Sequence, residues 1–386
     1  MKMNLPREWQ VVELGDLLKI IAGQAPPSSS YNKNKIGLPF LRVNSFNEKY
    51  PSTDTWTVHS LKECEERDIL LSVAGTIGSI NIADKKYSIT RSIFALRVDT
   101  EKLHNLYLFY FLKTLKEKLS SFGTGSSQKI ITIKTVESLR IPLPPLPIQK
   151  QIVSILEKAE KLKEMRKEAD ELTKDFLKAK FLEMFSQGLV KESSHVMLED
   201  ICTRITDGEH ITPRRVDKGI YLLSARNVLN HQVSLIDVDF IDEEEFKKIS
   251  KRIVPQLGDI LVSCSGTIGR VARVKEDYRF QLVRSVALIR PDTKKLNPIY
   301  LEYFFDTNYM QMQISKSINQ SSQANLFQGK IKKLKIYLPT IDRQNKFASI
   351  VKEVEVMKEY QKQSRENIKN LFNNLLQKSF KGELVC

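Results

Sequence analysis

The sequence predicts an α+β protein in which two α/β domains are each followed by a long helix. Three observations predict this fold. The chain contains one unit of about 190 residues twice, each unit begins with short β-branched runs bounded by Gly and Asp, and each ends in a long stretch with helical spacing of apolar residues. The two copies predict a pseudo-twofold internal repeat, whose period is far longer than that of solenoid proteins.

The repeat is clearest in a glycine-containing segment. Residues Arg67–Gly78 include Asp-Ile-Leu and Gly-Thr-Ile-Gly, and Gly258–Gly269 include both again 191 positions later. A match of this length is not expected by chance. Further matches follow in the same order: Arg91-Ser92 with Arg284-Ser285, Tyr107-Leu108 with Tyr300-Leu301, Ser126-Ser127-Gln128 with Ser321-Ser322-Gln323, and Leu143-Pro144 with Leu338-Pro339.

Each unit runs from strands through an aromatic-rich helix to a proline step. Strands are expected at 38–43, 68–73 and 93–98 in the first unit. The step Leu143–Pro147 cannot be helical up to its last proline, but Pro147 suits the first position of a helix. In the second unit Asp342 can cap the helix instead. These boundaries predict a domain at 1–146, a helix at 147–190, a second domain at 191–340 and a second helix at 341–386.

Both helical segments carry apolar residues at steps of three or four, as a coiled-coil seam requires. At 1.5 Å per residue, about 37 to 40 residues make a helix of roughly 55 to 60 Å, which is longer than a core helix needs. We therefore expect an antiparallel coiled coil, rather than helices that only pad a domain. Gln361 and Ser364 interrupt the second seam and either fix its register, receive a partner or lie in solvent. The predicted seam consists of Ile152, Ile155, Ala159, Leu162, Ala169, Leu172, Phe176, Phe347, Ile350, Val354, Met357, Ile368, Leu371 and Leu375.

The charge indicates an anionic partner. The chain has 61 Lys and Arg against 46 Asp and Glu, which gives a formal charge of +15. The excess is +6 in 1–146 and +5 in 191–340, so it is divided between the two domains and not confined to a tail. Two basic domains favour binding to nucleic-acid phosphates.

Other composition features exclude several classes of protein. Cys64, Cys202, Cys264 and Cys386 lie far apart without a Cys-x-x-Cys motif, so we expect free thiols, and the 5 histidines form no metal-binding motif. The longest apolar runs, such as 69–82, are too short and too polar to span a membrane. The start Met1–Arg7 lacks the apolar stretch of a signal peptide. We expect no metal, no membrane association and a cytoplasmic location.

The duplicated motifs resemble the specificity subunit of type I restriction-modification systems. Each half has an Ile-Leu-x-Ser-x-x-Gly-Thr-Ile-Gly segment around Gly75 or Gly266, a later Ser-Ser-Gln, and a Leu-Pro-x-x-x-x-Gln step that ends at Gln149 or Gln344. The resemblance covers essentially the whole chain. It implies two target recognition domains, each reading one part of a split sequence in double-stranded DNA. It also implies that the helices form a spacer and a docking surface for two methyltransferase subunits.

The resemblance further implies that this chain is not an enzyme and binds no cofactor itself. S-adenosylmethionine-dependent methylation and ATP-driven cleavage would belong to the methyltransferase and restriction subunits. Two alternatives stay open: a recognition subunit of a related phage-defence or modification system, and a self-contained DNA methyltransferase. The second is disfavoured, because Asn297-Pro298-Ile299-Tyr300 lacks the second proline of the amino-methyltransferase motif and no cofactor loop is found.

The segments that do not repeat predict how the target is read. Residues 24–35 differ from 207–215, and 46–56 differ from 228–240, as expected if the domains read different bases of an asymmetric target. Arg suits guanine, Asn and Gln suit adenine, and Lys or Ser more often grips phosphate. The predicted DNA-binding residues are Lys33, Lys35, Arg42, Asn44, Arg91, Ser127 and Gln128 in the first half, and His210, Arg214, Arg215, Arg226, Asn227, Arg284, Ser322 and Gln323 in the second.

Overall fold

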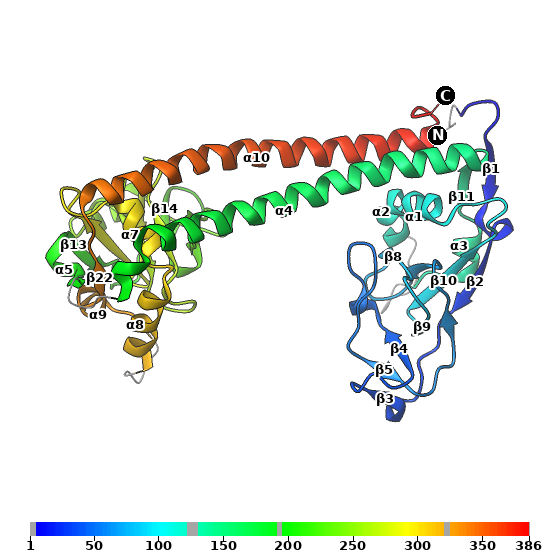
Figure 1. Ribbon diagram of the computed structural model, residues 1–386, viewed down its shortest axis with the longest axis horizontal. Helices are drawn as coiled ribbons and strands as arrows, with labels where there is room; N and C mark the ends of the chain where they lie inside the picture. Colours follow the sequence, from blue (N-terminus) through cyan, green and yellow to red (C-terminus); the bar gives the residue numbers. More distant parts are fainter. Residues whose placement is uncertain (1–4, 122–129, 191–194, 320–324, 386) are drawn as a thin grey trace. The chain divides into compact units, whose positions relative to one another are not determined.

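The structure is a computed structural model that describes residues 5–121, 130–190, 195–319 and 325–385. The chain divides into two compact units, Met1–Lys167 with Lys362–Cys386, and Glu168–Gln361. Each unit combines one mixed α and β domain with part of two long helices, α4 (Leu146–Val190) and α10 (Ile341–Lys381) (Figure 1). The units are described separately below.

The described part of the first unit contains a four-stranded antiparallel sheet of order β2-β10-β7-β8 and a five-stranded sheet of order β3-β5-β4-β9-β6, while β1 pairs with β11. Helix α1 (Asn105–Thr114) is almost wholly apolar and packs against β7 and β8. Its residues 107–112 are all buried, so it is covered on all sides. The other elements are β1 (Gln10–Glu13), β2 (Leu18–Ala22), β3 (Tyr31–Asn32), β4 (Leu38–Leu41), β5 (Trp56–Thr57), β6 (Glu63–Cys64), β7 (Ile69–Ser72), β8 (Ile80–Ile82), β9 (Tyr87–Ile89), β10 (Ile93–Val98), β11 (Arg140–Leu143), α2 (Lys116–Ser121) and α3 (Ile133–Glu137).

The described part of the second unit repeats this plan. Its sheet of order β13-β21-β18-β19 matches β2-β10-β7-β8, and its parallel pair β14–β20 matches the parallel pair β4–β9. The elements are β12 (His195–Met197), β13 (Cys202–Asp207), β14 (Ile220–Leu223), β15 (Val228–Leu229), β16 (Gln232–Val233), β17 (Asp239–Ile241), β18 (Ile260–Ser263), β19 (Val271–Arg273), β20 (Phe280–Leu282), β21 (Val286–Pro291), β22 (Lys335–Tyr337), α5 (Leu198–Ile201), α6 (Glu243–Ser250), α7 (Pro298–Phe304), α8 (Asn308–Asn319) and α9 (Gln328–Lys332).

The repeated sequence motifs make repeated bonds. Gln149 is fully buried at the start of α4, where its Oε1 accepts from the backbone of His104 and its Nε2 donates to the carbonyls of Lys102 and Pro144. Gln344 makes the same three bonds at the start of α10, to Asn297, Lys295 and Pro339. Replacing a buried amide whose hydrogen bonds are all made lowers stability, because the groups that bonded to it are left unsatisfied. The glutamine after each proline step therefore fastens a long helix to its domain.

The aspartate that begins each Asp-Ile-Leu segment has an equally repeated role. Asp68 accepts two hydrogen bonds from the Arg97 guanidinium, at 3.0 and 2.8 Å, and Asp259 accepts two from Arg290, at 2.8 and 2.7 Å. Such bidentate pairs are among the stronger side-chain interactions. They tie neighbouring antiparallel strands together in each four-stranded sheet.

The two long helices pack antiparallel within each unit. In the first unit the Lys163 ammonium of α4 lies 4.8 Å from the ring centre of Phe372 on α10. In the second unit Gln361 donates to Thr173 at 2.9 Å, and the Phe185 and Phe347 rings lie 5.8 Å apart. Residue numbers on α4 rise as those on α10 fall. The predicted fold class, with its internal repeat and paired helices, is confirmed.

The predicted seam is correct in part. Ile152, Ala159, Phe347 and Val354 are buried, and Ile155, Ala169, Ile350, Ile368 and Leu375 are half-buried. The prediction is wrong for Leu162, Leu172, Phe176, Met357 and Leu371, which are 43–62% exposed. One residue further along, Thr173, Leu177 and Phe372 are buried instead.

Heptad arithmetic explains this error. A 3-4 and a 4-3 alternation have the same period, and a shift of one residue turns the contact face by about 100°. The domain sets the phase in the second unit, because Phe181 and Phe185 pack against Tyr300 and Phe347. Gln361, only 9% exposed, finds its partner Thr173 inside the helix pair, and Ser364 is half-buried.

The described residues include no helix long and apolar enough to cross a membrane. Within the same ranges no group of three or more His, Cys, Asp or Glu side chains is placed to hold a metal ion. Cys64, Cys202 and Cys264 are free thiols, and Cys386 lies outside the described residues.

Candidate nucleic-acid interface

Four loops of the first unit meet at one edge of its sheets. The backbone N–H of Gly23 donates to Ile93, and that of Thr90 donates to Leu41. Val73 donates to the carbonyl of Ser92, which joins the turn after β7 to the turn between β9 and β10. We call this the loop edge of the first unit; it consists of Gly23–Gln24, Arg42–Ser45, Ala74–Gly75 and Thr90–Ser92.

A polar hollow of about 420 Å³ lies beside this loop edge. Its walls include Arg42, Asn44 and Asp54, together with Ser45, Ser52, Thr53 and Thr55. The Lys33 ammonium lies 3.3 Å from Asp54, so this predicted residue joins the group. Arginine, asparagine and aspartate are suited to guanine, adenine and cytosine edges respectively. Lys35 lies exposed on the preceding turn, with a positive φ of 59°.

Aromatic rings orient Arg42 at the hollow. Its guanidinium carbon lies 5.1 Å from the ring centre of Tyr31 and 5.4 Å from that of Phe40, and the two rings stack at 5.0 Å. Cation–π contact restricts the guanidinium without using its hydrogen-bond donors. Arg42 therefore remains able to donate to a base or a phosphate. Sequence reasoning identified Arg42 and Asn44 but missed Tyr31 and Asp54, which come close to them only through the fold.

The second unit has an equivalent loop edge, formed by Gly208–His210, Ser224–Asn227, Ser265–Gly266 and Val283–Ser285. Cys264 donates to the carbonyl of Ser285 as Val73 does to Ser92, and Val283 donates to Leu223. The Gly-Thr-Ile-Gly turns reach both edges through glycines in the left-handed region, with φ of 79° at Gly75 and 67° at Gly266. Each unit therefore presents one set of loops on the same scaffold.

Arg91 and Arg284 occupy equivalent places at the two loop edges. Both follow the short strand that pairs in parallel with its neighbour, and both side chains are exposed. Among the described residues neither guanidinium has an ion pair or a side-chain hydrogen bond. An unneutralised arginine at the same place in both domains suits contact with the phosphate backbone, which is common to all DNA sequences.

Three predicted arginines of the second unit are neutralised within the unit. Arg215 and Arg226 both bind Asp239, each at 2.8 Å, and Arg214 binds Asp242. Although burial alone would raise it, the pKa of Asp239 is lowered by these two guanidinium groups. Asp237 also lies 3.6 Å from Arg226, so the three guanidinium groups face three carboxylates from a different stretch of sequence. These pairs orient the arginines but reduce their value as phosphate contacts.

Asn227 corrects the prediction most clearly. It is fully buried; its Oδ1 accepts from the backbone of Ser224 at 3.0 Å, and its Nδ2 donates to the carbonyl of Ser234 at 3.0 Å. The short 3-10 turn Ala225–Asn227 directs Arg226 outward and Asn227 inward, so Asn227 holds the loop and cannot read a base. His210 is exposed, 3.1 Å from a nitrogen of Arg252. Ser127, Gln128, Ser322 and Gln323 lie outside the described residues.

Both halves of this duplicated arrangement match one known protein family. Residues 6–174 and 191–370 match the family described as the type I restriction modification DNA specificity domain. The chain belongs to this family.

Individual relatives agree with this assignment. The putative type I restriction enzyme MjaX specificity subunit of Methanocaldococcus jannaschii is 40% identical over 192 residues, which is 49% of this chain and 45% of that protein. The chain thus spans less than half the length of that relative. The EcoBI specificity subunit of Escherichia coli is 23% identical over 423 residues, covering 100% of this chain and 88% of the relative.

Solved structures support the fold alone. The S subunit of a type I restriction-modification system from M. genitalium superposes with a TM-score of 0.57 at 16% identity and covers 98% of both chains. A second solved chain gives a TM-score of 0.62 at 18% identity and covers 99% of this chain and 100% of its own length. Its structure is described as the structural basis underlying complex assembly and conformational transition of the type I R-M system.

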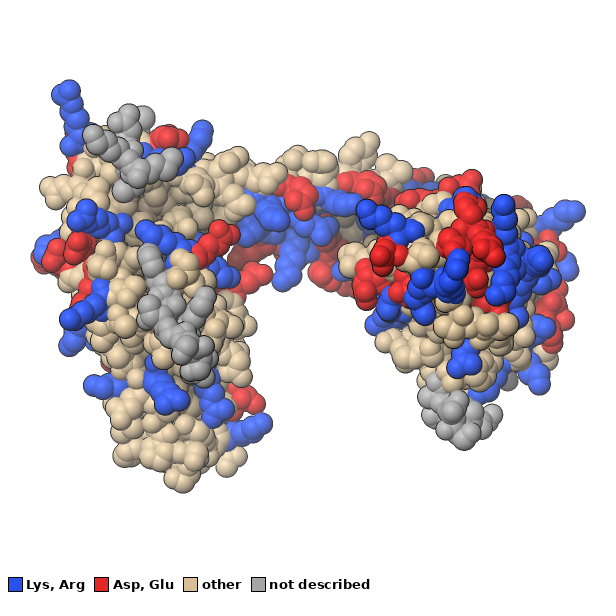
Figure 2. Space-filling view, turned by 180° about the vertical axis from the view of Figure 1, so that it is seen from behind, with Lys and Arg blue, Asp and Glu red and all other residues tan. Residues whose placement is uncertain are grey.

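Surface charge on the specificity chain is more mixed than its total suggests. Figure 2 shows Lys and Arg side chains over both units with Asp and Glu side chains among them, and a group of Lys and Arg side chains on the long helices. The net charge of +15 therefore gives the chain only a general attraction for anionic partners.

A glutamate on each long helix fastens that helix to its domain, and the sequence analysis missed both. Glu160 accepts from Lys113 at 2.9 Å and from the Tyr110 hydroxyl at 2.8 Å. Glu355 accepts from Arg273 at 3.0 Å and lies 2.5 Å from Lys275. The two glutamates are 195 positions apart, as are Gln149 and Gln344. That shared offset could have identified them as a repeated clamp.

In the second unit this clamp continues into a cluster of charged side chains around one buried glutamate. Glu302, fully buried on α7, accepts from Arg273 at 3.0 Å and lies 3.2 Å from Nδ1 of His231. Nε2 of His231 lies 2.6 Å from Asp306. We call His231, Arg273, Glu302 and Asp306 the Glu302 cluster. It anchors the β15–β16 turn, which carries His231, to α7.

We expect the stability of the second unit to fall as the pH rises through about 9. Burial alone would lower the pKa of His231, but Asp306 and Glu302 raise it to about 9. The stabilisation is fully present below the unfolded pKa of about 6.5 and is lost above about 9, with a maximum of about 3 kcal/mol. The check is the free energy of urea unfolding of the wild type and of His231→Gln between pH 6 and 10. A wild-type pH dependence equal to that of His231→Gln would contradict this assignment.

Proposed function

We propose that this chain is the non-catalytic DNA-recognition subunit of a type I restriction-modification complex, and that each unit reads one part of a bipartite, asymmetric target through its loop edge. The observation that carries the proposal is the combination of equivalent exposed arginines, Arg91 and Arg284, with different neighbours on a shared scaffold. A shared position suits a shared contact with phosphate. Differing positions suit different bases.

The 3-10 turns at the two loop edges carry different side chains at equivalent positions, which suits the reading of different bases. Val43–Ser45 and Ala225–Asn227 are equivalent turns, so Asn44 stands where Arg226 stands in the other unit. Asparagine pairs best with adenine and arginine with guanine. Asp239 and the carbonyl of Asp237 hold Arg226 in one orientation, whereas Asn44 lines the polar hollow. We infer that these two positions read bases and that Arg91 and Arg284 grip the backbone.

The helices supply a surface for partner chains. In the second unit Leu172 and Phe176 on α4 are 62% and 49% exposed, and Val356 on α10 is 58% exposed. Large apolar side chains that remain exposed on a long helix favour docking of another protein. We propose that two methyltransferase subunits dock on such helix surfaces and bring S-adenosylmethionine, and that ATP-dependent cleavage resides in restriction subunits bound through them.

We expect Arg91→Ala to weaken DNA binding without changing the bases recognised. Loss of one phosphate contact should reduce the slope of log affinity against log salt by about 1. Arg284→Ala should have the same effect from the other unit. The measurement is fluorescence anisotropy with target and scrambled duplexes from 50 to 300 mM salt. The matched control is Arg67→Ala, because Arg67 is also exposed but lies at the opposite end of β7.

The complex itself gives the test of the wider proposal. Methylated bases would be mapped in DNA treated with the chain and its copurifying methyltransferase subunits, for the wild type and for Asn44→Ala and Arg226→Ala. Each variant should relax one part of the target and leave the other intact. Relaxation of both parts by one substitution would refute the division between units. Methyl transfer from S-adenosylmethionine by the purified chain alone would refute the non-catalytic role.

A further inference from the structure

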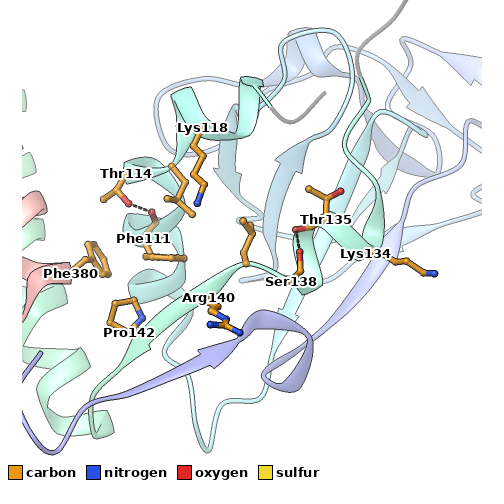
Figure 3. Close-up of a pocket in the computed structure, with 11 residues that line it drawn as sticks. Phe111, Thr114, Lys118, Lys134, Thr135, Ser138, Arg140, Pro142 and Phe380 are labelled. Atoms are coloured by element: carbon orange, nitrogen blue, oxygen red, sulfur yellow. Dashed lines mark hydrogen bonds between the residues drawn. The ribbon is translucent and has the colours of Figure 1, made fainter. Parts of the chain in front are cut away.

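A cavity of about 760 Å³ opens in the first unit, away from the residues assigned to DNA (Figure 3). It lies where the corner between α1 and α2 meets α3, β11 and the end of α10. A volume of this size is typical of sites that take a ligand or a side chain of a partner. The lining residues that matter for its chemistry are Phe111, Leu115, Lys118, Arg140, Pro142 and Phe380.

The cavity combines an apolar part of its wall with basic side chains. Figure 3 shows Phe111, Pro142 and Phe380 together, with Lys118 and Arg140 on other parts of the wall. The lining includes no Asp or Glu. The Arg140 side chain is 71% exposed, and its contact with Glu13 is long, at 3.5 Å. An occupant should therefore combine an apolar or aromatic group with negative charge.

The second unit shows what fits such a place, because there the chain supplies the aromatic group itself. Pro142 of β11 is equivalent to Tyr337 of β22, since the hydroxyl of Tyr107 donates to the Pro142 carbonyl and that of Tyr300 to the Tyr337 carbonyl. The ring of Tyr337 packs so closely on α4 that a Cβ added to Gly188 would lie 2.1 Å from it. Only glycine leaves room for this ring.

Two more positions carry an aromatic side chain in the second unit and a non-aromatic one in the first. His195 pairs with Tyr337 as Val11 pairs with Pro142, and the His195 ring lies 4.6 Å from that of Tyr309. Tyr309 and Lys116 occupy equivalent positions of the repeat, because they lie 193 residues apart, as Tyr300 and Tyr107 do. The second unit thus has Tyr, Tyr and His where the first has Pro, Lys and Val. The first unit lacks the aromatic group that its counterpart supplies, and Val11 is left 45% exposed.

We propose that the cavity of the first unit receives an aromatic side chain from an acidic segment of a partner protein. The ring lies against Phe111, Pro142 and Phe380, as Tyr337 lies against α4 in the second unit. Carboxylates that flank the ring pair with Arg140 and Lys118. Because Tyr337 fills the matching place in the second unit, the chain offers one such site, and its two halves are not equivalent to a partner of this kind.

Fluorescence anisotropy on the full chain tests the proposal with a labelled peptide, Glu-Asp-Tyr-Asp-Glu. The same peptide with alanine for tyrosine, and Lys-Lys-Tyr-Lys-Lys, test the ring and the charge separately. We expect only the acidic aromatic peptide to bind, at one site per chain. Equal binding of the alanine peptide would overturn the role of the cavity, and equal binding of the basic peptide would overturn the role of Arg140 and Lys118.

Substitutions locate the site. Pro142→Tyr installs the residue of the second unit and should weaken peptide binding by about tenfold or more, as loss of an interface anchor does. Arg140→Glu should weaken it as well, whereas Lys335→Glu, at the equivalent basic position of β22, should not. Thermal unfolding would verify that each variant folds. Unchanged binding to folded Pro142→Tyr would overturn the proposal. Self-association of the wild type that Pro142→Tyr abolishes would also overturn it, because the occupant would then be a second copy of this chain.

Discussion

Glu302→Ala is expected to lower the free energy of unfolding of the second unit by about 3–5 kcal/mol, which is the usual cost of removing one partner from a buried ion cluster. Glu302 is fully buried, and its carboxylate contacts both Arg273 and His231. Burial alone would raise its pKa, but His231 and Arg273 hold the pKa below its usual value. The carboxylate is therefore charged, and its loss leaves two half-buried cations, His231 and Arg273, facing each other without it.

The measurement is urea unfolding at pH 7, followed by circular dichroism. Glu359→Ala on the exposed side of α10 serves as the control and should change the free energy of unfolding by less than about 0.5 kcal/mol. Glu302→Gln should fall between the two, because it keeps the shape but not the charge. A loss for Glu302→Ala no greater than that of the control would mean that Arg273 and His231 are adequately held by Glu355 and Asp306.

The Glu302 cluster also shows where sequence reasoning ends. At the equivalent position the first unit has Phe109, which is fully buried beneath the ammonium of Lys113 at 4.4 Å. A repeat alignment alone gives no reason for phenylalanine in one copy and glutamate in the other. The reason is His231, which arrives from a hairpin 71 positions earlier in the chain.

Features set by neighbouring residues were predictable. The helices begin at Leu146 and Ile341, beside the predicted starts at 147 and 341, because the geometry of proline restricts locally where a helix can begin. The predicted cap Asp342 lies one residue inside α10 instead. The glycine turns and the order of strands around them also recur in both units. These features depend on backbone preference and on periodicity, which a sequence displays directly.

Features set by distant partners were not predictable. The sequence predicts Arg214, Arg215 and Arg226 as DNA-binding residues, but it does not show that Asp237, Asp239 and Asp242 pair with them. The apolar residues Leu172 and Phe176 suited a seam, but the contact face lies one residue further along. In both cases the sequence shows the type of side chain, whereas the tertiary contact that decides its role comes from another part of the chain.

The second large effect concerns the distance between the two parts of the DNA target that the units are proposed to recognise. We expect seven-residue insertions in both helices, between Lys167 and Glu168 and between Gln361 and Lys362, to lengthen the unspecified spacer of the proposed bipartite DNA target by about three base pairs. The insertions fall where the compact units divide, so each domain keeps its own helix contacts. Seven residues add about 10 Å of helix, and each base pair of DNA occupies about 3.4 Å. Seven is also one heptad, so the phase of the helix contact is preserved.

Mapping methylated bases with the assembled complex measures this effect directly. The two recognised sequences should remain those of the wild type, because Arg42, Asn44, Arg226 and the loop edges are untouched. A seven-residue insertion in α4 alone is the control; it leaves α10 too short to pair along its length, so it should lower stability without creating a new spacing. An unchanged spacer in the double insertion would show that the helices do not set the distance between the two sites. Loss of one recognised sequence would show instead that recognition depends on both units together, which the separate loop edges argue against.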